Sequence, residues 1–182
     1  LLRNIFECAG EGIFIANEKS DIIAANPSAC QILGYKNEEE LIGINAKDLV
    51  HPEDQKVMSL SMAMELAIKD NAARFERRYK KADGSFLPVR VTIKYMTEQG
   101  YHNIIFTDIS EEIKNKEVLK QNEKRYSQLF ETATDAIYFM NAHGKIIDTN
   151  KAACKMLGRD KEEMLNLSID DVDPNFPLNE FL

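Results

Sequence analysis

One short stretch of this chain occurs twice in similar form. Residues 22–35 read IIAANPSACQILGY, and residues 146–159 read IIDTNKAACKMLGR. The alignment places Phe6 on Phe130 and continues without a gap through both stretches. Identical pairs within it include Asn26/Asn150, Ala29/Ala153, Cys30/Cys154, Leu33/Leu157 and Gly34/Gly158. Because the offset is as long as a domain, and far longer than a solenoid unit, the sequence predicts a tandem duplication of one fold.

Each copy opens with the signals of a β-hairpin followed by a short helix. Two short apolar runs are separated by a polar turn, which indicates the hairpin. Asn26 then suits a helix N-cap, Pro27 the first helical position, and Gly34 a left-handed stop. Asn37 and Glu40 are spaced as a capping box, which predicts a second short helix.

The rest of the first copy changes from helical to strand periodicity. Residues 52–69 have a broad apolar face and carry Pro52 in the first turn, so they predict one helix. Three runs of alternating apolar and polar residues follow, at 73–81, 86–96 and 101–109. This order predicts an antiparallel sheet with helices on one face, which defines an α+β domain.

A strongly polar segment, residues 109–129, joins the two copies and is predicted to be a connecting helix. Asp108 and Glu111 are spaced as a capping box at its start. Its apolar stripe is interrupted, because Lys116 and Glu123 stand where a coiled coil needs apolar side chains. The segment therefore predicts weak pairing of two helices, as in a loosely held homodimer.

Charge and cysteine content argue against several classes of function. The 182 residues carry a net charge of −7, which disfavours binding to nucleic acid or to an anionic membrane surface. No apolar run is long enough to span a bilayer. The three cysteines form no Cys-x-x-Cys pair, so we expect free thiols, no metal site and a cytoplasmic location. No acid–base constellation is visible, so the chain is expected to be non-catalytic.

Five motifs in order resemble PAS domains of the sensory-box type: ANPSACQILGY, ELIG, LVHPED, RRYKKADGSFLPVRV and IIFTDISEEI. The resemblance implies a PAS fold, with a five-stranded antiparallel sheet and helices on one face. It divides the chain into a first PAS domain at 1–108, a connecting signalling helix at 109–129 and the N-terminal half of a second PAS domain at 130–182.

The resemblance further implies a sensory or relay module of a larger signalling protein. We expect a two-component sensor histidine kinase, whose phosphorelay output domain lies elsewhere in the same full-length chain. A diguanylate cyclase or a transcription regulator is an alternative output. A ligand-free dimerisation or spacer module is an alternative of a different class.

In PAS domains a ligand or partner is sensed in the cavity between sheet and helices, and the signal leaves through the helix after the last strand. By resemblance, the residues expected to line the cavity are Met58, Met62, Phe75, Arg77, Tyr79, Val91 and Ile104. Those expected to relay the signal are Thr107, Asp108, Ile109 and Ser110. A small-molecule ligand is possible on this basis, and its identity is left open.

The cofactor remains unknown, and two familiar cofactors of the family are disfavoured. Cys30 lies outside the motif that carries the reactive cysteine of flavin-binding members, and the helix at 52–69 has no His to bind haem. Arg77 alternates with Phe75 and Tyr79, so it is a candidate to point inward and to meet a charged ligand; the favoured interpretation is an Arg that reaches solvent at the sheet edge. His102 is a weaker candidate of the same kind and is expected to face solvent near a strand end.

Overall fold

A computed structural model describes residues 2–69, 72–96 and 100–173. The chain divides into two compact units, Leu1–Lys114 and Asn115–Leu182. Each unit is described by itself below.

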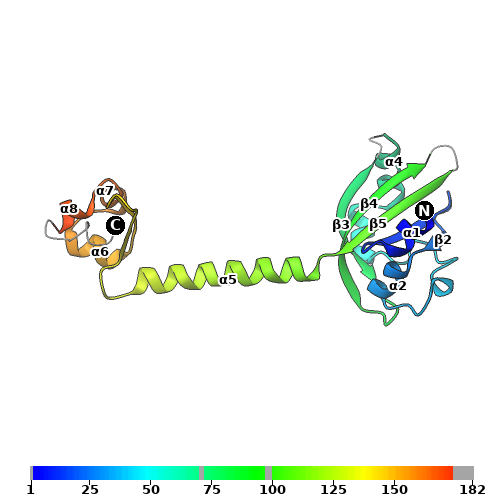
Figure 1. Ribbon diagram of the computed structural model, residues 1–182, viewed down its shortest axis with the longest axis horizontal. Coiled ribbons are helices and arrows are strands. Elements are labelled where there is room, and N and C mark those ends of the chain that lie inside the picture. The colour runs from blue at the N-terminus through cyan, green and yellow to red at the C-terminus, as the bar shows by residue number, and fades with distance from the viewer. Residues whose placement is uncertain (1, 70–71, 97–99, 174–182) are drawn as a thin grey trace. The chain divides into compact units, whose positions relative to one another are not determined.

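The first unit is built on a five-stranded antiparallel sheet (Figure 1). Its strands are β1 (Gly12–Ala16), β2 (Ile22–Ala25), β3 (Ala73–Lys80), β4 (Phe86–Met96) and β5 (Tyr101–Asp108). They lie in the order β2-β1-β5-β4-β3, so that the first and last strands in sequence are neighbours at the centre. The predicted α+β class and the five-stranded sheet are confirmed.

Short helices surround this sheet, and two of them pack on it. The helices are α1 (Leu2–Cys8), α2 (Pro27–Leu33), the 3-10 helix η1 (Glu38–Glu40), α3 (Pro52–Val57) and α4 (Leu60–Lys69). Helix α2 contacts β1, and α4 contacts β3 and β4. The apolar residues of the inner sheet face, of α2 and of α4 belong to one core. In this core the Phe106 ring packs against the rings of Phe14 at 4.8 Å and Tyr79 at 5.3 Å.

The prediction of one helix over residues 52–69 is wrong, because the chain breaks into α3 and α4. Met58 is extended, with φ −144° and ψ 103°. The Ser59 hydroxyl oxygen then accepts a hydrogen bond from the backbone N–H of Met62 at 3.2 Å, which caps the next helix. A serine within an apolar helical pattern is a favourable N-cap, and here it starts a new helix instead of continuing the old one.

Asn26 fixes the junction between the hairpin and α2, as predicted, but it does more than cap a helix. Its Oδ1 accepts from the N–H groups of Ala29 and Ile13, both at 2.9 Å. Its Nδ2 donates to the carbonyl oxygens of Glu11 at 2.9 Å and Phe6 at 3.1 Å. One fully buried side chain therefore ties α1, β1 and α2 together.

The second unit repeats the start of the first. Helix α5 (Ser110–Thr132) leads into β6 (Tyr138–Met140), β7 (Ile146–Thr149), α6 (Lys151–Leu157), α7 (Lys161–Leu165) and α8 (Ile169–Val172). Asn150 caps α6 through the N–H of Ala153 and also bonds Ile137 and Asp135, as Asn26 does with its own neighbours. The predicted second copy of the hairpin and helix is confirmed. The last part of the predicted 130–182 segment lies outside the described residues.

Candidate functional site

A small cavity of about 160 Å³ lies between α3 and β3 in the first unit. Its lining consists of Asp54, Val57, Met58, Phe75, Glu76 and Arg77. Two larger hollows, of about 360 and 380 Å³, lie beside Cys30 and beside Asn17. The charged side chains that line those hollows are exposed or half-buried, whereas the smaller cavity contains a buried arginine. The smaller cavity is therefore the candidate site.

Arg77 is the distinctive residue of this cavity. Although β3 is an edge strand, the side chain of Arg77 is only 6 % exposed, so it does not reach into solvent as an edge arginine usually does. Its guanidinium carbon lies 4.1 Å from the centre of the Phe75 ring. Its Nε and Nη1 are buried and have no hydrogen-bond partner within the described part of the chain. Burial lowers the pKa of Arg77, because the charged form loses hydration.

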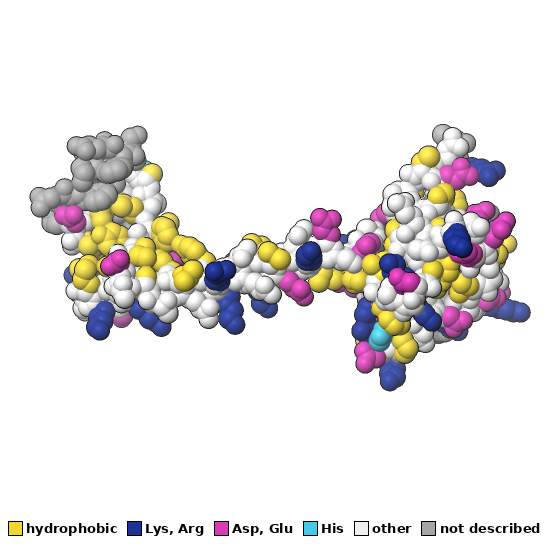
Figure 2. All heavy atoms as spheres, turned by 90° about the horizontal axis from the view of Figure 1, so that it is seen from below, with side chains coloured by type: hydrophobic (Ala, Val, Ile, Leu, Met, Phe, Trp, Pro, Cys, Tyr) yellow, Lys and Arg dark blue, Asp and Glu magenta, His cyan; other side chains and the backbone are white. Residues whose placement is uncertain are grey.

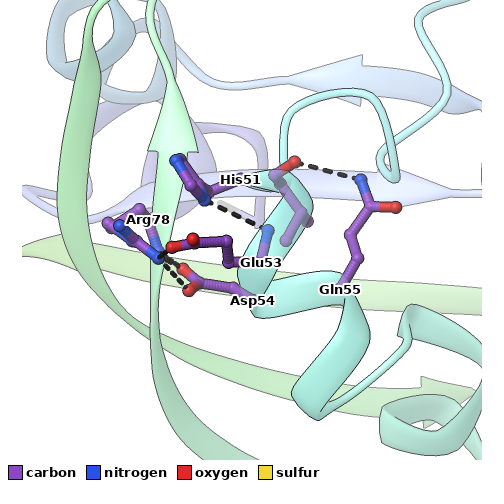
Figure 3. Close-up of polar contacts among 6 residues, drawn as sticks. His51, Glu53, Asp54, Gln55 and Arg78 are labelled. Atoms are coloured by element: carbon purple, nitrogen blue, oxygen red, sulfur yellow. Dashed lines mark hydrogen bonds and ion pairs between the residues drawn. The ribbon is translucent and has the colours of Figure 1, made fainter.

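The acidic residues on the cavity wall are bound to other arginines. Arg78 donates from Nη2 to one Asp54 oxygen at 2.6 Å and from Nε to the other at 3.2 Å. The backbone N–H of Arg78 also bonds Asp54, at 2.7 Å, and Glu53 adds a contact at 3.1 Å (Figure 3). The Arg78 side chain lowers the pKa of Asp54. Asp54 thereby fastens α3 to β3 and holds one wall of the cavity in place.

The structure brings together three of the residues predicted to line the cavity: Met58, Phe75 and Arg77. The side chains of Tyr79, Val91 and Ile104 are buried in the core of the inner sheet face. Burial raises the pKa of Tyr79 to about 12.

Met62 does not line the cavity, since it is 53 % exposed on α4. The break before α4 changes which of its residues face the sheet, and Ala63 and Ala67 are the buried ones.

At the end of β5 the chain passes directly into α5. Ile109 is buried, and its N–H donates to the carbonyl of Pro88 in β4 at 3.1 Å. The Asp108 carboxylate accepts from the N–H of Ser110 at 2.8 Å. Asp108 therefore caps α5 through the N–H of Ser110. This hydrogen bond takes the place of the capping-box contact that was expected between Asp108 and Glu111. Thr107 donates to the Glu11 carboxylate at 3.1 Å.

Arg90 was not identified as a functional residue from the sequence. Its Nη2 donates to Glu76 of β3 at 2.9 Å and to Glu112 of α5 at 3.0 Å. The strand register places Glu76 opposite Arg90 and Arg90 opposite Thr107. The pairing of Arg90 with Glu76 could have been inferred from their opposite charges on the outer face, but only once the strand register was known.

The expectation that His102 faces solvent is wrong. Strand alternation puts it on the same face as Ile104 and Phe106, and it is 5 % exposed. Its ring lies 5.0 Å from that of Tyr95, and its Nδ1 is buried without a partner among the residues described. Burial lowers the pKa of His102, against a smaller opposing effect of Glu18.

The described residues contain no group of three or more His, Cys, Asp or Glu side chains able to hold a metal ion. The thiols of Cys8, Cys30 and Cys154 are free. Burial raises the pKa of Cys30, which keeps this thiol protonated and unreactive. Within the described ranges no helix is both long and apolar enough to cross a membrane.

A five-stranded antiparallel sheet with short helices, a small pocket between a helix and the edge strand β3, and a last strand that continues into a long helix are features of a class of small sensory domains. The family model "PAS domain" matches residues 10–111, and the model "PAS fold" matches residues 124–175. The chain belongs to the PAS domain family.

Among curated proteins, the chain is similar to Sporulation kinase E of Bacillus subtilis, with 26 % identity over 170 residues. The match covers 93 % of this chain but only 22 % of that kinase, so the chain spans about a fifth of its relative's length.

Two solved structures show the same fold at low identity. A PAS domain from Colwellia psychrerythraea has a TM-score of 0.54 at 18 % identity, over 60 % of this chain and 95 % of that one. The PAS domain of a LuxR-family transcriptional regulator from Burkholderia thailandensis, in complex with ethanol, has a TM-score of 0.52 at 19 % identity. That match covers 59 % of this chain and 96 % of the other.

Proposed function

We propose that this chain is a non-catalytic sensory and relay module of a sensor histidine kinase. The similarity to a kinase over nearly the whole chain supports this assignment. The observation that carries the relay function is Arg90, which bonds the cavity-lining Glu76 on one side and Glu112 of α5 on the other. A change at the cavity strand therefore has a direct bonded route to the start of the helix that leaves the domain.

Two cross-strand rows lead from β3 to α5. One row contains Glu76, Arg90 and Thr107, and the neighbouring row contains Arg77, Val89 and Asp108. Thr107, Asp108, Ile109 and Ser110 lie where these rows meet the helix. A shift of β3 would move the Asp108 cap and the Arg90 bridge together, and so alter how α5 begins.

Helix α5 is proposed to pass the signal on within a cytoplasmic homodimer. Almost all of its side chains are exposed, including the large apolar ones at Leu119, Tyr126 and Leu129. On the face seen in Figure 2, apolar side chains of this helix alternate with charged ones. A mixed surface of this kind pairs weakly, which suits a helix that changes its packing when a signal arrives.

The relay is tested by Arg90→Gln. We expect the hydrogen-bonded backbone amides of Ser110 and Ile113 to exchange hydrogen about two- to fivefold faster, because exposed ion pairs contribute up to about 1 kcal/mol. Arg74→Gln is the matched control on the same outer face, since among the described residues the Arg74 side chain bonds Thr92 and neither Glu76 nor Glu112. Unchanged exchange at the start of α5 in Arg90→Gln would contradict the relay.

The output is tested by reading the gene beyond the codon for Leu182. A helical pair with a phosphorylatable His and an ATP-binding domain is expected in the full-length chain. A diguanylate cyclase or DNA-binding domain there would replace the kinase by another output. If no substitution in the cavity or the relay changes the output activity of the full-length protein, the chain serves as a spacer module and not as a sensor.

A further inference from the structure

We propose that the cavity beside Arg77 binds a small monoanionic carboxylate, with the Arg77 guanidinium as its anchor. The inference rests on the proposed sensory function and names the chemical class of its ligand. It is carried by one side chain that is more than nine-tenths buried, charged and unpartnered at two nitrogens, beside a cavity that the same residue lines.

First, the Arg77 guanidinium has no counter-ion among the described residues. A buried guanidinium is costly unless its charge and its N–H groups are compensated. Arg77 takes part in no ion pair with the described residues, and the two carboxylates on the cavity wall, Asp54 and Glu76, are bound to Arg78 and Arg90. The Phe75 ring at 4.1 Å offsets only part of the cost. An acceptor group brought by a ligand would supply the rest.

The second step is the size and charge of that ligand. The cavity, at about 160 Å³, is well below the roughly 300 Å³ at which drug-sized pockets begin. Val57, Met58 and Phe75 give it an apolar wall, which suits a short hydrocarbon tail. Asp54 and Glu76 remain close by, and their negative charges oppose a second charge on the ligand. A short-chain carboxylate fits these limits better than a phosphate or a dicarboxylate.

The third step is the consequence of binding. Nε and Nη1 of Arg77 are enclosed, so the guanidinium has to turn toward the cavity and away from the Phe75 ring to meet a carboxylate. Arg77 stands in the same cross-strand row as Val89 and Asp108, the residue that caps α5. The carboxylate would thus act on the strand that leads to the exit helix.

The experiment compares propionate with propionamide, which has a similar shape and no charge. Nitrogen-15 spectra of the arginine side chains are recorded on the whole chain at constant ionic strength, and Arg77 is assigned from the signal lost in Arg77→Gln. We expect propionate to shift the Arg77 Nε–H signal saturably and to raise the melting temperature by about 2–4 °C. Propionamide should do neither. Arg74→Gln, on the same strand but exposed, should keep both responses, and Arg77→Gln should lose them.

Arg77→Met gives a second and independent readout. It keeps most of the side-chain volume and removes the buried charge, so without ligand its melting temperature should equal or exceed that of the wild type. A clear fall would show that the protein itself already satisfies Arg77, and would overturn the proposal. Equal responses to propionate and propionamide, or a propionate response that persists in Arg77→Gln, would overturn it as well.

The outcomes for the ligand and for the relay are separable. If propionate shifts Arg77 while the amides at the start of α5 are unaffected, the binding site stands and the relay fails. If propionate does not bind but Arg90→Gln changes exchange in α5, the relay stands and the carboxylate site is wrong.

Discussion

At the scale of single residues, the repeated motif depends most on its asparagine. The sequence predicted Asn26 as a helix cap, and that prediction describes one of its four side-chain hydrogen bonds. The bonds to Ile13, Glu11 and Phe6 were not predictable, because they depend on where distant backbone segments lie in the fold. A buried side-chain amide whose donors and acceptor are all used in this way is expensive to replace.

Asn26→Ala should therefore lower the free energy of unfolding of the first unit by about 2–4 kcal/mol, since it removes a cap and leaves backbone groups unpaired. Asn37→Ala is the matched control. Asn37 is an exposed cap with one bond to the Glu40 N–H at 3.2 Å, and its loss should cost about 0.5–1 kcal/mol. Hydrogen exchange of the slowest amides in β4 and β5 measures both losses. Equal losses in the two variants would contradict the bridging role of Asn26.

The face of a residue in a strand was predictable, but its partners were not. Alternation along β3 made Arg77 a candidate to point inward, and the structure buries it there, so the favoured interpretation of an Arg that reaches solvent at the sheet edge was wrong. The same rule applied to β5 gives His102 as an inward residue, and the expectation of solvent exposure came from its position near a strand end. Whether a buried cation has a counter-ion depends on contacts between segments far apart in sequence, which local pattern does not contain.

At the scale of elements, the Asp54–Arg78 contact joins α3 to β3 and shapes the candidate site. We call this contact the clamp. The sequence indicated a helix start at Pro52, and the structure places Glu53 and Asp54 in the first turn, where acidic side chains are favourable. The fold uses Asp54 for a second purpose, since its carboxylate receives three hydrogen bonds from Arg78. This tertiary bond positions Val57 and Met58 at the cavity wall.

The clamp predicts a dependence of stability on pH. Because Arg78 lowers the pKa of Asp54 in the folded state, the ionised carboxylate stabilises the fold above the unfolded pKa of about 3.9. That contribution should be lost as the pH falls through the lower, folded pKa. Urea unfolding between about pH 5 and pH 2 should show a shallower loss of stability in Asp54→Asn than in the wild type.

Arg78→Gln supplies the control for this prediction. It removes the cause of the lowered pKa and should flatten the same pH dependence. Adding Asp54→Asn to Arg78→Gln should then change the slope little further, because both substitutions act on one interaction. If the free energy of unfolding of Asp54→Asn depends on pH as steeply as that of the wild type, other carboxylates govern the loss of stability in acid.

The break between α3 and α4 shows what periodicity alone misses. Residues 52–69 carry an apolar pattern that fits one helix, and the pattern does not record where the backbone turns. Ser59 was the available signal, as a cap-forming residue inside the pattern. The break moved Met62 out of the predicted cavity lining and left Met58 within it.

At the scale of the whole molecule, the duplication was predictable from the sequence, and one position at which the copies differ is constrained by packing in the first copy. Gly12 of the first copy aligns with Ala136 of the second. A methyl group at Gly12 would collide with the ring of Phe106 from β5, so glycine is required there.

Two equivalent substitutions test whether the copies are independent folding units. Asn26 and Asn150 occupy the same place in their copies and make the same kinds of bond. Asn26→Ala should speed hydrogen exchange in β1 to β5 and leave β6, β7 and α6 unchanged, while Asn150→Ala should do the reverse. The expectation follows from the contacts of each asparagine, all of which lie within its own unit. If either substitution speeds exchange in both units, the copies unfold together, and the helix between them transmits stability as well as a signal.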